Sequence, residues 1–241
     1  MDENELKKIA ASISGFTSPE SCFLLYSLVK GLDKSGDILE IGSYKGRVTI
    51  SLAQALKEKG VGKLHSIDSN FLGCRDEFLH NLKRCGVGDL VIPHFASSAV
   101  VNRGWNNPLA FIWHDTDGDY NVRALDFLLW ERFLVVGGVL AFSCADMPQT
   151  QRFVQDFIVG SGRFKKVEFS GSVVYAYKSM PTPFYSCAKK IFATELSRCY
   201  YEIKRLHLSL AKGIFNLTGD EELCYKKIFR LIFKQFVSFN K

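Results

Sequence analysis

Five acidic side chains stand near the ends of short apolar runs, where a folded chain would present them to a ligand. They are Glu40, Asp68, Asp115, Asp117 and Asp146. A carboxylate accepts hydrogen bonds from hydroxyl and ammonium groups, and it can also remove a proton in a reaction. Because an acid that ends a buried strand is costly without a partner, this pattern favours ligand binding or general base catalysis over a purely structural role.

The first of these acids precedes a glycine loop with the pattern Glu-x-Gly-x-x-x-Gly, from Glu40 to Gly46. Gly42 ends an apolar run, and Gly46 opens an amphipathic segment typical of a helix. A strand that turns through glycines onto a helix N-terminus presents backbone N–H groups close to a ligand. The spacing differs from the Gly-x-Gly-x-x-Gly of dinucleotide sites, and Glu40 would repel a pyrophosphate. A ligand with ammonium and hydroxyl groups therefore fits this loop better.

The elements that must position these residues alternate along the chain. Apolar runs predict strands at 38–41, 63–68, 90–95, 109–113 and 139–144, and a closing pair within 164–177. Helical spacing predicts helices at 3–14, 19–30, 46–59, 75–85, 121–136 and 149–158, the second capped by Ser18 with Pro19 at its first position. This order indicates an α/β fold, a Rossmann-like, doubly wound, mostly parallel sheet with an antiparallel edge hairpin. Ligands bind such sheets at the carboxyl ends of the strands.

Three motifs carry a resemblance to a known family. Residues 39–53 form a first motif, Ile67-Asp68-Ser69 a second, and residues 111–138 a third, in which Asp115, Asp117 and Tyr120 fall on two acids and an aromatic. Over residues 35–180 the chain resembles class I S-adenosylmethionine-dependent methyltransferases. It is most similar to the small-molecule O-methyltransferases whose fourth strand ends Ile-Asp-Gly-Asp-His.

The resemblance implies a role for each loop. Residues 42–46 would hold the methionine part of S-adenosylmethionine, Asp68 would bind both ribose hydroxyls, and Ser97 or Ser98 would lie near the adenine. Asp115 would lie beside the methionine amine or the reacting centre. The candidate cofactor-binding residues are Glu40, Gly42, Ser43, Tyr44, Gly46, Asp68, Ser97 and Asp115.

Methyl transfer to a hydroxyl also needs a base. The candidate catalytic residues are His114, Asp115 and Asp117, whereas Asp119 is interpreted as a turn residue. On the following helix, Asp126 is interpreted as a surface charge and Trp130 as a packing aromatic.

Metal-assisted relatives hold a divalent cation that acidifies the acceptor hydroxyl. The candidate ligands here are Asp115, Asp117 and Asp146, an oxygen-rich set that suits magnesium or manganese. Two departures from the family pattern count against a bound metal: its histidine falls on Gly118, and the acid after strand five falls on Cys144.

Composition limits the class of protein. Seven scattered cysteines without a Cys-x-x-Cys pair indicate reduced thiols, and the acidic N-terminus lacks a signal-peptide pattern, so we expect a cytoplasmic protein. The net charge of +6 resides in residues 181–241, which hold 11 Lys or Arg and 5 Asp or Glu. We expect a methyltransferase domain at 1–180, with N-terminal helices in 1–34 and a core in 35–180, and a basic helical extension at 181–241.

The extension has two interpretations. Its apolar residues recur at helical spacing between Lys and Arg, which suits either peripheral contact with an anionic membrane or packing on the domain or in a homodimer. The second is favoured. Nucleic acid is not an expected partner, because no recognition motif is present and residues 1–180 are neutral.

The sequence therefore predicts methyl transfer from S-adenosylmethionine to a small-molecule hydroxyl, with a sugar or secondary metabolite as the acceptor. Two alternatives are a non-catalytic cofactor-binding or interaction protein on the same fold and, disfavoured by the glycine spacing, a nicotinamide enzyme.

Overall fold

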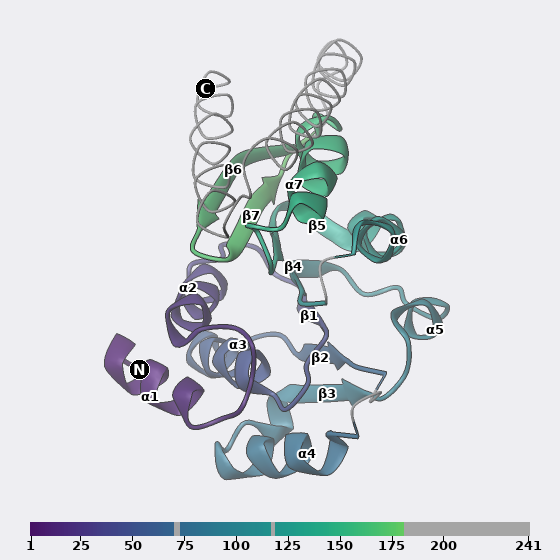
Figure 1. Cartoon of the computed structure of the whole chain (residues 1–241). Helices are drawn as coiled ribbons and strands as arrows, with labels where there is room; N and C mark the ends of the chain where they lie inside the picture. The colour runs from purple at the N-terminus through teal and green to yellow at the C-terminus, as the bar shows by residue number, and fades with distance from the viewer. Residues whose placement is uncertain (70–72, 117–118, 181–241) are drawn as a thin grey trace, which may run out of the picture.

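Seven strands form one sheet in the computed structural model, which describes residues 1–69, 73–116 and 119–180 (Figure 1). The strands are β1 (Asp37–Ile41), β2 (Leu64–Ile67), β3 (Val91–His94), β4 (Leu109–His114), β5 (Leu134–Phe142), β6 (Phe164–Ser170) and β7 (Val173–Lys178). Their spatial order is β3-β2-β1-β4-β5-β7-β6, and β1 to β5 run parallel while β7 is antiparallel to both of its neighbours. The predicted Rossmann-like sheet with an antiparallel edge hairpin is confirmed.

Helices cover both faces of this sheet. They are α1 (Glu3–Ala11), α2 (Pro19–Lys30), α3 (Arg47–Lys59), α4 (Arg75–Arg84), α5 (Ser98–Asn102), α6 (Tyr120–Trp130) and α7 (Pro148–Phe153), with shorter turns at Gly88–Leu90 and Glu131–Phe133 and a π-helical continuation of α7 at Val154–Val159. Figure 1 shows α1 to α3 gathered on one side and α5 to α7 on the other.

Strand alternation divides the core into two clusters. In β4, Phe111 and Trp113 pack with the residues of α1 to α4, whereas Ile112 between them packs with those of α6 and α7. Successive side chains of a strand point to opposite faces, so each buried strand contributes to both clusters. Adjacent residues at a strand end therefore also lie on opposite sides of the sheet, which matters for the site below.

The predicted start of the second helix is confirmed. Ser18 is the N-cap of α2, its hydroxyl accepts a hydrogen bond from the backbone N–H of Ser21, and Pro19 is the first helical residue. Glycines end the same helix and α3, at Gly31 and Gly60. The capping signals read from the sequence thus set these boundaries.

The predicted helix at 121–136 is too long. α6 ends at Trp130, and Leu134 already belongs to β5, where it pairs with Leu109 of β4 and is buried in the second cluster. The prediction extended the helix because apolar residues recur on both sides of Glu131-Arg132. Only the pairing with a neighbouring strand distinguishes a helix from a strand at this point. Gly137 and Gly138, which the predicted ranges leave between a helix ending at 136 and a strand beginning at 139, consequently lie inside β5.

The short helix α5 was not predicted. The proposed extension, residues 181–241, lies outside the described residues, and its role and the domain boundary at 180 stay predictions. Within the described ranges, the structure contains no helix with both the length and the apolarity that crossing a membrane requires.

Candidate active site

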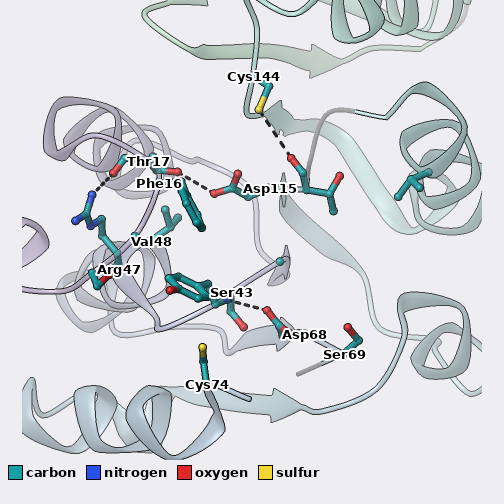
Figure 2. A pocket seen from close by; sticks show the side chains of 16 residues that line it. Phe16, Thr17, Ser43, Arg47, Val48, Asp68, Ser69, Cys74, Asp115 and Cys144 are labelled. Atoms are coloured by element: carbon teal, nitrogen blue, oxygen red, sulfur yellow. Dashed lines mark hydrogen bonds between the residues drawn. The ribbon is translucent and has the colours of Figure 1, made fainter. Parts of the chain in front are cut away.

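A pocket of about 690 Å³ opens at the carboxyl ends of β1, β2, β4 and β5 (Figure 2). This is the position expected for a ligand site in a sheet of this topology. Its wall comes from the strand ends, the start of α3 and the loop between α1 and α2. The lining residues are Ser14, Gly15, Phe16, Thr17, Gly42, Ser43, Tyr44, Arg47, Val48, Asp68, Ser69, Cys74, Asp115, Thr116, Val122 and Cys144.

The glycine loop requires its glycines. Gly42 has a φ of 90°, and a Cβ at this position would lie 1.9 Å from the carbonyl oxygen of Asp115. Gly46, also at φ 90°, is the N-cap of α3, and a Cβ there would lie 3.2 Å from the ring of Phe78. The loop can therefore pass between β4 and α4 and bring the α3 N-terminus to the pocket only without side chains at these two positions.

Asp68 follows β2 and lines the same pocket. Its Oδ2 accepts a hydrogen bond of 2.8 Å from the backbone N–H of Tyr44, which itself has a φ of 48°. This bond ties the end of β2 to the glycine loop. Because a carboxylate has lone pairs for several hydrogen bonds, Asp68 keeps the capacity to bind ligand hydroxyls while it holds the loop.

Asp115 lines the pocket at the end of β4. Its Oδ2 accepts a hydrogen bond of 2.8 Å from the hydroxyl of Thr17, in the loop before α2. Burial raises the pKa of the Asp115 carboxyl above its usual value, and the hydroxyl groups of Thr17 and Ser143 oppose that rise. A carboxyl with a raised pKa is a stronger base than an ordinary aspartate, which suits proton removal.

The loop between α1 and α2 was missed as part of the site. The guanidinium of Arg47 donates from Nε to the carbonyl oxygen of Ile13 (2.7 Å) and from Nη1 to that of Thr17 (2.8 Å). Arg47 thus holds both ends of residues 14–17 against the start of α3. Figure 2 shows its bond to Thr17. The sequence feature that could have indicated this loop is Gly15-Phe16-Thr17, a glycine followed by an apolar ring between two predicted helices.

Glu40 does not line the pocket. It is fully buried in β1, where its Oε2 accepts hydrogen bonds from the hydroxyl groups of Thr49 (2.6 Å) and Ser66 (2.8 Å). Burial raises its pKa to about 8, and these two hydrogen bonds oppose the rise. Glu40 therefore links β1, β2 and α3 inside the fold. The expectation that it binds the same ligand as the glycine loop is not supported, because it lies outside the pocket.

His114 also points away from the pocket. Its ring is 2% exposed and its Nε2 lies 2.7 Å from Oδ2 of Asp126 in α6. Burial lowers the pKa of His114, and the bond to Asp126 opposes this. The interpretation of Asp126 as a surface charge is wrong, because its side chain is buried in this pair. Trp130, as predicted, packs in the second cluster.

The other candidates are dispersed. Ser97 is exposed at the N-cap of α5 and Asp146 is partly buried after β5, and neither lines the pocket. Cys144 does line it, and its Sγ lies 3.8 Å from the carbonyl oxygen of Thr116. Asp117 and Gly118 lie outside the described residues. Among the residues that are described, no three His, Cys, Asp or Glu side chains are grouped to hold a metal ion.

Residues 39–143 match a family model described as a methyltransferase domain, which is the part of the chain that carries β1 to β5. Three solved structures show the extent of the structural likeness. An O-methyltransferase from Bacillus cereus in complex with SAH is 20% identical with a TM-score of 0.56, and the match covers 73% of this chain and 90% of that one.

The O-methyltransferase TomG from Streptomyces achromogenes, involved in tomaymycin synthesis and in complex with SAM, is 17% identical with a TM-score of 0.54, over 75% and 100% of the two chains. An rRNA methylase from Streptococcus thermophilus is 16% identical with a TM-score of 0.50, over 69% and 100%. The fold is thus shared with solved structures described as O-methyltransferases and with one described as an rRNA methylase.

The fold, the position of the pocket and the match over residues 39–143 agree with one another. The predicted resemblance is confirmed at the level of the fold: residues 39–143 match the methyltransferase-domain model, and the chain has the fold of the class I methyltransferases.

Proposed function

We propose that this protein transfers a methyl group from S-adenosylmethionine to a small-molecule hydroxyl. The observation that carries the proposal is the single pocket that joins the glycine loop, Asp68 and Asp115 at adjacent strand ends. The three features were expected to share a ligand from sequence alone, and the fold brings them to one cavity.

The residues present fit this cofactor. Gly42 and Gly46 leave the backbone open to the methionine part, and Asp68 accepts hydrogen bonds, as two ribose hydroxyls require. S-adenosylmethionine supplies a methyl group activated by its sulfonium. The chain then has to align the acceptor, exclude water and take up a proton.

Asp115 is the proposed base. Among His114, Asp115 and Asp117, it is the candidate whose carboxylate lines the pocket in the described structure, and burial raises its pKa. Thr17 fixes the orientation of its carboxylate through the 2.8 Å hydrogen bond. The acceptor hydroxyl would transfer its proton to Asp115 as its oxygen bonds to the methyl carbon.

Calorimetry with S-adenosylmethionine tests cofactor binding. We expect micromolar affinity for the wild-type protein, a loss of at least about 100-fold for Asp68→Ala because charge-assisted hydrogen bonds are lost, and no change for Asp76→Ala, an exposed acid of α4. Wild-type protein without measurable binding would refute the proposal.

A second candidate is a cofactor-binding protein without catalysis, favoured by His114 facing the core and Cys144 standing in place of an acid. Methyl transfer from labelled cofactor to a panel of sugar and phenolic hydroxyl compounds separates the two. Transfer lost in Asp115→Asn supports the enzyme, whereas tight cofactor binding without transfer to any member supports the binding protein.

A further inference from the structure

Phe16 is a large apolar side chain left open to the pocket. Its ring is 86% exposed although it lines the cavity. Exposed apolar rings at the mouth of a pocket are typical of residues that a ligand covers on binding.

The backbone on both sides of Phe16 is held in place. Arg47 binds the carbonyl oxygens of Ile13 and Thr17, which bracket the loop. Gly15 packs directly on this arginine, since a Cβ at Gly15 would lie 3.1 Å from the Arg47 side chain. These contacts fix the backbone of the loop, and the backbone in turn orients the exposed ring of Phe16.

The ring faces the part of the pocket beside the glycine loop. Its centroid lies 5.3 Å from that of Tyr44, with 35° between the two planes. Figure 2 shows Phe16 between the Thr17–Asp115 hydrogen bond and the loop that carries Ser43. This is the region in which the proposed function places the methionine part of the cofactor, whereas the ribose is placed at Asp68.

We propose that Phe16, with Tyr44 beside it, recognises the positive charge of the sulfonium and so distinguishes the methyl donor from its product. This inference rests on the proposed function. The negative face of an aromatic ring attracts a ligand cation, most strongly where water is excluded. On transfer, the S–CH₃ bond breaks, sulfur keeps the electron pair, and a C–O bond forms while the acceptor loses its proton. The product thioether is neutral, so the attraction disappears and the product is released more readily.

The test compares three ligands by calorimetry: S-adenosylmethionine, S-adenosylhomocysteine and adenosine. In Phe16→Leu, which keeps apolar bulk without a ring, we expect the affinity for S-adenosylmethionine to fall about five- to tenfold. The affinities for the neutral product and for adenosine should change less than about twofold, because neither carries the sulfonium charge. Phe16→Tyr should keep the wild-type ratio between donor and product.

Leu128→Ala is the matched control, because Leu128 is an exposed apolar residue of α6 outside the pocket. Its three affinities should equal those of the wild-type protein. An equal loss for donor and product, or no loss for either, would overturn the inference while leaving the proposed function intact. An equal loss for adenosine would show that Phe16 stacks on the base instead, and also overturns it. Wild-type protein that binds neither donor nor product would refute the proposed function and the inference together.

Discussion

Two neighbouring residues at the end of β4 lie on opposite sides of the sheet. Asp115 faces the pocket, where Thr17 donates a hydrogen bond to it, while His114 faces the core, where it pairs with Asp126. Both residues follow the same buried strand, and strand alternation alone sends them to different sides of the sheet. A candidate base therefore has to be assigned by the face of the sheet on which its side chain lies. Its position in the sequence does not distinguish His114 from Asp115, because both are adjacent to the same motif.

The largest effect should come from breaking the core pair. In Asp126→Ala the buried His114 ring loses its partner, so we expect the free energy of unfolding to fall by about 2 to 3 kcal/mol. Affinity for S-adenosylmethionine at a temperature where the variant remains folded should stay within about twofold. Urea unfolding and calorimetry measure the two quantities, and a selective loss of affinity without loss of stability would place this pair at the site instead.

Removing the hydrogen bond between Thr17 and Asp115 should impair methyl transfer and leave stability largely unchanged. Thr17→Val keeps the shape of the side chain but removes the donor to Asp115, so we expect methyl transfer to fall about tenfold, or about 1.4 kcal/mol. Without that hydrogen bond to the charged form, the pKa of Asp115 should rise further, moving the acidic limb of the rate profile to higher pH. Thr17→Ser should restore both the rate and the profile, and a serine variant as impaired as valine would contradict the assigned role.

Two buried groups should give opposite pH dependences of stability. The pKa of Glu40 is raised from 4.5 to about 8, so between these values the folded state keeps a proton that the unfolded chain releases. The free energy of unfolding therefore falls as pH rises from 4.5 to about 8. Glu40→Gln should match the wild-type protein near pH 5 and exceed it by about 1 kcal/mol or more at pH 8.5. Equal stability of the two proteins at both pH values would contradict the buried, raised pKa.

His114 should give the opposite pH dependence of stability. Because its pKa is lowered from 6.5 in the folded state, the unfolded chain binds more protons below that pH, and stability falls as pH decreases. His114→Gln should show a weaker fall between pH 7 and 5, although His65 and His94, whose pKa values are also lowered by burial, retain part of it. Chemical unfolding at the two pH values measures this smallest effect, and an unchanged slope would indicate that the pKa of His114 is the same in the folded and unfolded states.

Much of the fold was predictable because local signals and the global topology agree. Ser18 and Pro19 mark the start of α2, and the glycines of the Glu-x-Gly-x-x-x-Gly loop mark the strand-to-helix turn. The end of α6 was not predictable in this way. Leu134 belongs to a strand because it pairs with Leu109, a contact between residues far apart in the sequence that periodicity does not contain.

The lining of the pocket was predictable at the ends of β2 and β4 and not where packing decides which way a side chain points. Asp68 and Asp115 line the pocket, but Ser97 and Glu40 follow similar signals and do not. Arg47 and Thr17 were missed because their roles depend on a contact between the loop at 14–17 and the start of α3, which no spacing reveals.

The most direct test of the central claim is a crystal structure of the protein with S-adenosylhomocysteine. We expect both ribose hydroxyls within hydrogen-bond distance of Asp68, the methionine part against Gly42 and Tyr44, and the sulfur between Phe16 and Asp115. A ligand bound outside this pocket, or with its ribose away from Asp68, would contradict the account.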